Sequence, residues 1–262
     1  GVQKILRDFA EVRREVSQYA AEYLELAGFQ GPLRLRFRGV VENTLIPVEV
    51  GEEGCWWSNS GDSISSTLTR AIDLTGLERA TLSYQVWYQV EKGWDYGYVQ
   101  VSLDEVETWQ ILAAPHTSPE NPIGNAFGPG YTGQSGGWVD ERVDLTPYAG
   151  KKIWLRFQYV TDDAINGAGL CLRQISVPEA PRWDRGQGWQ AEGFIHTDNR
   201  VRQGYIVQVI QVGEGNRVTE LPLDASNAGE LFIPNAKELR RLVVVVAALA
   251  PKTRQPAPYT LT

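Results

Sequence analysis

Short segments of alternating apolar and polar residues, separated by turn residues, dominate this sequence from Leu33 onward. In the first of them Leu33, Leu35 and Phe37 alternate with arginines, which is the period of a β-strand with one buried face. Similar segments follow at 66–72, 80–90, 96–102, 108–113, 139–144, 153–161 and 169–177. No helical segment of useful length lies between them, which argues against a parallel βαβ arrangement. The pattern predicts an antiparallel sandwich or jelly roll.

A second group of strand-like segments follows residues 178–188, a stretch typical of a linker. These segments lie at 189–195, 204–212, 217–223, 230–233 and 242–250. The run Leu242–Leu249 is continuously apolar and mostly β-branched, which favours a central strand buried on both faces. The group predicts a smaller β-sandwich of immunoglobulin type.

The first residues have a different period. Apolar residues recur at three- and four-residue steps over 2–27, charged residues occupy the other positions, and Gly28 and Pro32 follow. This spacing predicts an amphipathic helix that packs on the rest of the chain or on an upstream domain. The expected fold is therefore mainly β, with a helix in 1–30, a jelly roll in 31–180 and a small immunoglobulin-like domain in 181–262.

The composition argues against several functions. A net charge of −7 and an isoelectric point near 5.0 disfavour binding to nucleic acid. The longest apolar run, 242–250, is too short for a membrane span of roughly 20 residues. The two histidines, His116 and His196, lie far apart without an HExxH motif, so no zinc site is expected in this chain. No nucleophile with a recognisable base accompanies them, and we predict no catalytic residue.

Carboxylates and aromatic residues are the richer resources. Acidic residues at predicted strand ends or loops are Asp62, Glu91, Asp95, Asp104, Asp140, Asp162 and Asp163. Oxygen donors of this kind suit calcium, although solvated turn residues are the simpler alternative, and a carboxylate-based glycosidase is a third.

Most tryptophans lie on predicted strands and are expected in the core. Trp94, in the turn EKGWDYG, is the best candidate for an exposed ring that stacks on a sugar. The glycine-rich stretch 115–137 is longer than most loops, carries Phe127 and Tyr131, and is expected to form a ligand site with Trp94.

Two cysteines, Cys55 and Cys171, permit one internal disulfide. Terminal strands of a jelly roll are often neighbours, so the two thiols could meet, and a bridge over so long a loop would contribute roughly 4–5 kcal/mol. Sequence alone leaves the bridged and the free state open.

Several segments resemble one known family. They include WWSNSGD at 56–62, VEKGWDYGYVQVS at 90–102, GNAFGPGYTGQSGG at 124–137 and GLCLRQISVPE at 169–179. In order and content they resemble the non-catalytic C-terminal region of secreted bacterial immune inhibitor A-like metallopeptidases, a jelly roll similar to MAM domains. The segments GWQAEGFI at 188–195 and ALAPKTRQPAPYTL at 248–261 are similar to the small β domain that often closes these proteins.

The resemblance does not carry peptidase activity onto this chain, because the family's HExxH motif is absent. Relatives usually have Asp-Asp-Ile near the end of the jelly roll, where this chain has Leu172-Arg173-Gln174-Ile175; if those acids hold calcium in relatives, the site is weakened or lost here. The remaining candidate calcium ligands are Glu91, Asp95 and Asp163, with Asp62 as a weaker fourth.

Two functions follow as expectations. The first is a non-catalytic accessory region of an exported peptidase-family protein, secreted or at the cell surface. Its expected partner is an upstream catalytic domain of the same protein, for which the resemblance implies zinc metallopeptidase activity. The alternative is a free-standing module that binds a carbohydrate or a surface protein through Trp94 and the 115–137 loop.

Overall fold

Residues 3–6, 11–180 and 188–262 are described by the computed structural model, and they form β-strands joined by turns and loops. Two 3₁₀ turns, Thr146–Tyr148 and Ala236–Glu238, are the helical elements in these ranges. None of the described helical segments is long and apolar enough to cross a membrane. The chain divides into two compact units: unit 1 comprises Gly1–Pro47 and Arg200–Thr262, and unit 2 comprises Val48–Asn199.

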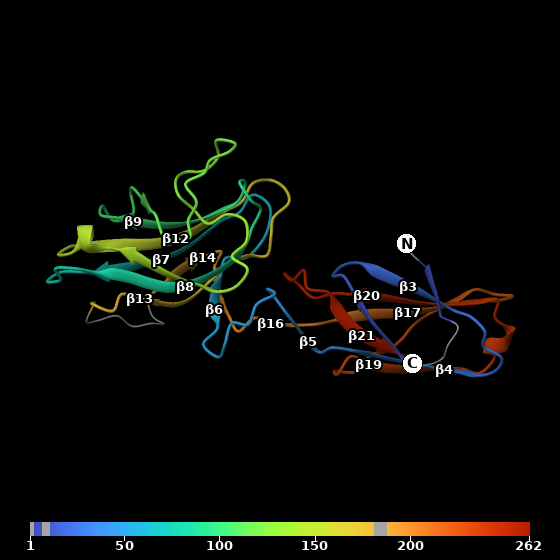
Figure 1. Cartoon of the computed structure of the whole chain (residues 1–262). Coiled ribbons are helices and arrows are strands. Elements are labelled where there is room, and N and C mark those ends of the chain that lie inside the picture. The colour runs from blue at the N-terminus through green and yellow to red at the C-terminus, as the bar shows by residue number, and fades with distance from the viewer. Residues whose placement is uncertain (1–2, 7–10, 181–187) are drawn as a thin grey trace. The chain divides into compact units, whose positions relative to one another are not determined.

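Unit 2 is an antiparallel sandwich of two sheets, and Figure 1 shows β9, β12 and β7 in one layer with β8 and β13 in the other. The first sheet has the order β10-β9-β12-β7-β14, from Gln110–Leu112, Tyr96–Ser102, Lys152–Val160, Ser65–Asp73 and Gln190–Glu192. The second has the order β11-β8-β13-β6-β15, from Val139–Asp144, Thr81–Gln89, Gly169–Ser176, Cys55–Trp57 and Ile195–Thr197. The alternating sequence pattern predicted this arrangement.

The inward faces of these two sheets form one apolar core. Val99, Leu155 and Phe157 from the first sheet pack with Leu82 and Leu172 from the second, and all five are essentially inaccessible to solvent. Strand β9 is buried along its whole length, because the core covers one face and the 115–137 loop contacts the other. This double coverage fixes the start of β9, where the candidate site lies.

Unit 1 is also built from two sheets. One has the order β1-β3-β20-β17-β18, from Gln3–Leu6, Ala21–Leu26, Arg241–Ala248, Tyr205–Val212 and Arg217–Glu220. The other has the order β19-β4-β21-β2, from Ala228–Ile233, Leu33–Gly39, Ala257–Leu261 and Val12–Val16. A two-stranded ribbon pairs β5 (Glu42–Thr44) with β16 (Arg200–Arg202). Strand β20 lies in the middle of its sheet with nearly every residue buried, as its apolar run predicted.

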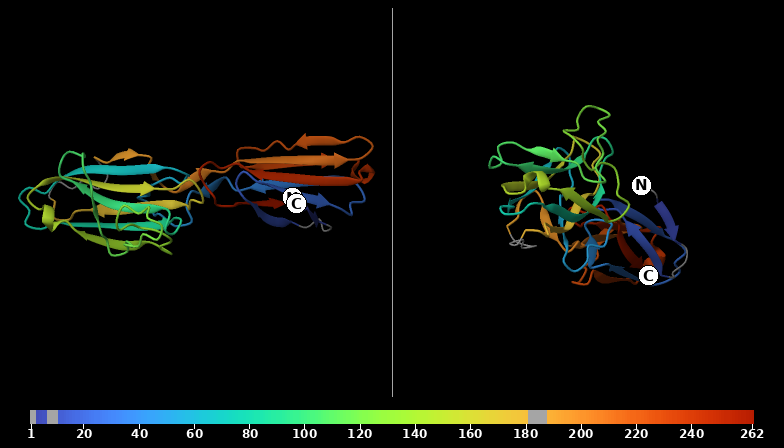
Figure 2. Two further views of the ribbon diagram at one scale, coloured as in Figure 1. Left: turned by 90° about the horizontal axis from the view of Figure 1, so that it is seen from above. Right: turned by 60° about the vertical axis from the view of Figure 1, so that its left-hand side comes forward.

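The prediction of an N-terminal helix is wrong. Within 2–27 the described residues form β1, β2 and β3, and β2 belongs to a different sheet from β3. Strand β3 pairs with β20 and β2 pairs with β21, so the antiparallel partners of these two strands lie more than 200 residues away in the sequence. Figure 2 shows these blue strands among the orange and red strands of unit 1. Long-range sheet pairing outweighs the local spacing of apolar residues here.

The two units also differ from the expected division into 1–30, 31–180 and 181–262. Residues before Pro47 and after Arg200 form one unit because their strands alternate within the same two sheets. Most of the expected linker lies at 181–187, outside the described residues. The immunoglobulin type expected for the smaller sandwich stays a prediction.

Candidate functional site

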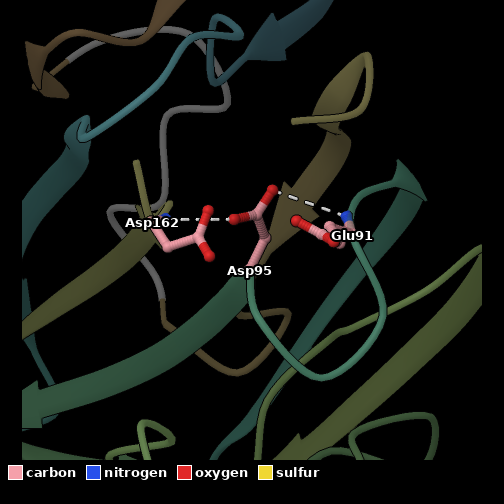
Figure 3. A group of neighbouring side chains, drawn as sticks. All are labelled: Glu91, Asp95 and Asp162. Carbon is pink, nitrogen blue, oxygen red and sulfur yellow. Dashed lines mark hydrogen bonds between the residues drawn. The ribbon is translucent and has the colours of Figure 1, made fainter. Parts of the chain in front are cut away.

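Three carboxylates come together at one end of the unit 2 sandwich. Glu91 and Asp95 lie in the turn between β8 and β9, and Asp162 follows β12. Because β9 and β12 are antiparallel neighbours, Tyr96 at the start of one strand lies opposite Val160 at the end of the other. One carboxylate oxygen from each of the three acids lies within 4.8 Å of the others. Figure 3 shows Asp95 between Glu91 and Asp162; we call these three residues the acidic trio.

Hydrogen bonds hold the side chain of Asp95 in place. The backbone amide of Asp162 donates to Oδ1 at 3.2 Å, and that of Glu91 donates to Oδ2 at 3.4 Å (Figure 3). The hydroxyl of Tyr159 also donates to Oδ2, at 3.4 Å. Asp95 is fully buried, whereas Glu91 and Asp162 are half-buried. The central carboxylate is therefore fixed in one orientation, with the other two nearer to solvent.

The electrostatics of the trio favour a bound cation. Burial raises the pKa of Asp95 to about 6. The charges of Asp162 and Glu91 add to this shift, and the two backbone hydrogen bonds oppose it. At pH 7 the group is still mostly ionised, and its repulsion from the two neighbouring carboxylates is relieved when a cation binds. Purely oxygen donors suit calcium, which takes about six to eight oxygen ligands. The donor set thus fits a calcium ion whose effect would be to join the β8–β9 turn to the end of β12.

The trio contains two of the four predicted ligands, Glu91 and Asp95. The structure places Asp162 beside them and leaves Asp163 exposed to solvent. Asp62 is exposed and accepts a hydrogen bond from the side-chain amide of Asn166 instead. Asp162 and Asp163 are adjacent after the same strand, and their local sequence does not show which of them belongs to the trio. The structure does, because the backbone N–H of Asp162 donates a hydrogen bond to Asp95.

The two predicted ligand-binding aromatic residues have different environments. Trp94 is 45% exposed, and its carbonyl accepts a hydrogen bond of 2.9 Å from the side-chain amide of Asn125. Tyr131 is only 1% exposed, and its hydroxyl lies 2.5 Å from that of Tyr84. The ring of Tyr131 fills the core and is not available to a ligand from solvent. The alternation of β strands could not show this, because Tyr131 lies in a loop that folds back on the sandwich.

The 115–137 loop is an ordered part of unit 2. Ser118 and Gly130 exchange backbone hydrogen bonds of 2.8 and 3.0 Å, and Gly97 and Tyr131 exchange bonds of 2.9 and 2.8 Å. Gly130 approaches Tyr98 so closely that a Cβ would lie 2.8 Å from its ring. Only glycine permits this contact, which explains one of the many glycines in the loop.

A buried acid near this loop was missed at the sequence level. Glu141 of β11 is 1% exposed, and one of its oxygens accepts from the backbone amide of His116 at 3.2 Å and lies 3.1 Å from Nδ1 of the same residue. It shares the inward face of β11 with Val143, so the alternation VDERVD carried a signal for its burial. Burial raises the pKa of Tyr131, and the neighbouring Tyr84 and Glu141 add to this shift.

The two cysteines are joined in the structure. Cys55 of β6 and Cys171 of β13 form a disulfide with an S–S distance of 2.01 Å across a sequence separation of 116. His196 lies near this bridge, with its ring edge-on to Trp56 at a centroid distance of 5.1 Å. The two histidines therefore contact different partners, Glu141 and Trp56.

Residues 35–181, more than half of the chain, match the family model described as immune inhibitor A-like, MAM domain. The chain is 32% identical over 125 residues to the pre-pro-metalloprotease PrtV of Vibrio cholerae, covering 48% of this chain and 13% of that protein. It is 30% identical over 125 residues to immune inhibitor A of Bacillus thuringiensis subsp. alesti, covering 47% of this chain and 17% of that protein. It is 27% identical over 98 residues to bacillopeptidase F of Bacillus subtilis, covering 37% of this chain and 6% of that protein. Each match thus spans less than a fifth of the relative's length.

Proposed function

Because the chain belongs to the immune inhibitor A-like MAM domain family, we propose that it is a non-catalytic accessory region of an exported peptidase-family protein. The single observation that carries this proposal is the family match itself, because the same region recurs as a small part of much longer proteins, one of which is named a metalloprotease. The sequence contains no HExxH motif and only two histidines.

A proteolysis assay tests the first part of this proposal. The purified chain is incubated with casein, with and without added zinc, beside a metallopeptidase as the positive control. We expect no release of peptides above the blank. Casein cleavage that co-elutes with the chain in gel filtration and is abolished by a chelator would contradict the proposal.

The partner in this proposal is a catalytic domain in the same polypeptide, and the whole protein is secreted or held at the cell surface. Sequencing the complete reading frame around this region is the direct test. We expect an export signal and an HExxH motif in the same frame. A frame that lacks both would contradict this part of the proposal and leave the accessory role without a catalytic partner.

Structural calcium is the second part of the proposal, and the acidic trio supports it. A cation that binds only the folded state stabilises it, by about 2.7 kcal/mol at a concentration 100 times the dissociation constant. Addition of millimolar calcium is therefore expected to raise the melting temperature, and EGTA to lower it again, as followed by tryptophan fluorescence. The Asp95→Asn variant is expected to lose most of this response, whereas Asp163→Asn keeps it. An identical response of the two variants would contradict the assignment of Asp95 as a ligand.

A second candidate function, binding to a surface ligand such as a glycan, is favoured by the exposed ring of Trp94. A glycan array compares the chain with its Trp94→Ala variant. Retention of a glycan by the parent chain and its loss in the variant would support this candidate; an array without hits would remove it.

A further inference from the structure

Apolar side chains gather at the end of unit 2 that holds the acidic trio. Trp94 lies in the β8–β9 turn and is 45% exposed, and Ile123 and Phe127, in the 115–137 loop, are 45% and 70% exposed. We call these three residues the apolar rim. Ile165, which is 77% exposed in the turn after β12, adds a fourth apolar side chain at the same end of the sandwich. Large apolar residues grouped at the surface of a soluble protein mark an interaction site.

Hydrogen bonds and ring packing hold the apolar rim in place. The side-chain amide of Asn125 donates to the carbonyl of Trp94 at 2.9 Å, which ties the loop to the β8–β9 turn. The amide of Phe127 donates to the hydroxyl of Tyr98 at 3.1 Å, and the two rings pack with centroids 5.8 Å apart. Tyr98 is buried, so the exposed ring of Phe127 rests on the body of the sandwich. The rim is exposed in a preorganised form, which lowers the entropy lost on binding.

The loop uses its polar side chains internally. The side chain of Asn121 accepts from the amide of Ala126 at 2.9 Å and donates to its carbonyl at 3.3 Å. The side-chain nitrogen of Asn125 donates to the carbonyl of Trp94, whereas its buried oxygen has no hydrogen-bond partner among the residues that the structure describes. The contact surface of the rim itself is thus mainly apolar, which fits an apolar surface as its ligand.

The charges around the rim favour a surface with choline headgroups over one with anionic headgroups. Acidic residues that are exposed at this end include Asp62, Glu120 and Asp163, whereas Lys92 supplies one positive charge in the β8–β9 turn. Anionic lipid headgroups are repelled by such a surface. A quaternary ammonium group is attracted both by carboxylates and by the faces of aromatic rings. Phosphatidylcholine has no net charge, its quaternary ammonium lies outside its phosphate at the bilayer surface, and an apolar layer lies beneath the headgroups.

We propose that the apolar rim docks unit 2 on the surface of a phosphatidylcholine bilayer, with Trp94, Ile123 and Phe127 in the interfacial layer and the surrounding carboxylates facing choline. Tryptophan and phenylalanine side chains are favoured at this depth of a bilayer. The inference goes beyond the accessory role and does not need the acidic trio to hold calcium, so its test is carried out in EGTA.

Co-sedimentation with vesicles of pure 1-palmitoyl-2-oleoyl-phosphatidylcholine is the primary experiment. The wild-type chain is compared with Phe127→Ser and Trp94→Ser, and with Phe232→Ser as the matched control, because Phe232 is 54% exposed on β19 of unit 1. We expect each rim variant to bind about tenfold more weakly, since each loses an apolar side chain from the interface, and Phe232→Ser to bind as wild type. Circular dichroism checks that all four chains are folded.

A second readout reports depth of insertion. Vesicles with brominated acyl chains are expected to quench part of the tryptophan fluorescence of the wild type, and Trp94→Phe is expected to lose this quenching while still sedimenting with lipid. Replacement of a third of the lipid by phosphatidylglycerol is expected to weaken binding in EGTA.

Four results would overturn the proposal. They are no sedimentation of the wild type at millimolar lipid, equal binding of Phe127→Ser and wild type, stronger binding on adding phosphatidylglycerol in EGTA, and complete displacement by millimolar free phosphocholine. The last result would indicate a soluble headgroup site instead of a bilayer surface.

Discussion

Asp95 couples the stability of unit 2 to protons. Its carboxyl group is fully buried between two other acids, and its pKa is raised to about 6 by burial above all. In the unfolded chain the pKa returns to its ordinary value near 4. Between these two values the folded state binds more protons than the unfolded state, so the contribution of Asp95 to stability is present below pH 4 and is lost as the pH rises to 6.

The Asp95→Asn variant isolates this effect. In EGTA, the unfolding free energy of the wild type relative to Asp95→Asn is expected to fall by about 2 kcal/mol between pH 4 and pH 7. Urea denaturation at pH 4, 5 and 7, followed by tryptophan fluorescence, measures the difference. Carboxylates remote from Asp95 contribute equally to both proteins and cancel. A difference that does not change with pH would show that burial does not disfavour the ionised Asp95.

Tyr84 and Tyr131 form a buried pair whose energetics can be measured by a double-mutant cycle. Their hydroxyls lie 2.5 Å apart in the core, so removing either one leaves the other without that partner. Each single change to phenylalanine is expected to destabilise unit 2 by about 1–3 kcal/mol, and the double change by less than the sum of the two. Thermal or urea unfolding provides the four free energies. Additive effects would mean that the hydroxyls do not interact.

For single residues, the sequence predicted which kinds of side chain form the site better than it predicted the role of each residue. Glu91 and Asp95 were predicted as ligands because carboxylates at strand ends and in loops offer the oxygen donors that calcium prefers, and both lie in the trio. The choice between Asp162 and Asp163 depends on the backbone direction after β12, which no local pattern encodes. Tyr131 was expected at a ligand site, but a long loop leaves side-chain direction undetermined until its contacts with β9 are known.

Among the elements, alternating segments predicted strands closely. Strands β9 and β11 have the predicted bounds, and β12 and β13 differ by one residue at one or both ends. The helix prediction for residues 2–27 was wrong because their apolar residues fit both a helical period and a strand period. Leu24 and Leu26 also alternate as a strand requires, and Tyr19 interrupts the segment with a φ of 56°. The deciding partners, β20 and β21, lie at the other end of the chain.

This strand assignment predicts the effect of truncation. A chain that starts at residue 31 lacks β2 and β3, which pair with β21 and with the central strand β20, so unit 1 is expected to unfold. A chain that starts at residue 11 lacks only the edge strand β1 and is expected to keep unit 1 folded. Dispersion of amide resonances in NMR spectra distinguishes the two outcomes. Equal dispersion of unit 1 resonances in both truncations would contradict the role of β3.

For the whole molecule, the division into two units gives each its own spectroscopic signal. All nine tryptophans lie between Val48 and Asn199, so their fluorescence reports on unit 2 alone. The disulfide lies within the same unit, and Cys55 and Cys171 both belong to its second sheet. Unit 1 contains no cysteine and no tryptophan, and its own backbone amide resonances report on its unfolding.

Removal of the disulfide is therefore expected to act on one unit. The double variant Cys55→Ala, Cys171→Ala frees a loop of more than 100 residues in the unfolded state and should destabilise unit 2 by about 4 kcal/mol. The tryptophan fluorescence transition is then expected at a melting temperature lower by about 10 °C, while the resonances of unit 1 keep their own transition. On our proposal that the acidic trio holds calcium in folded unit 2, added calcium is expected to recover part of the loss. An equal fall in the melting temperatures of both units would mean that they unfold together. The effect of the disulfide would then belong to the whole chain and not to unit 2 alone.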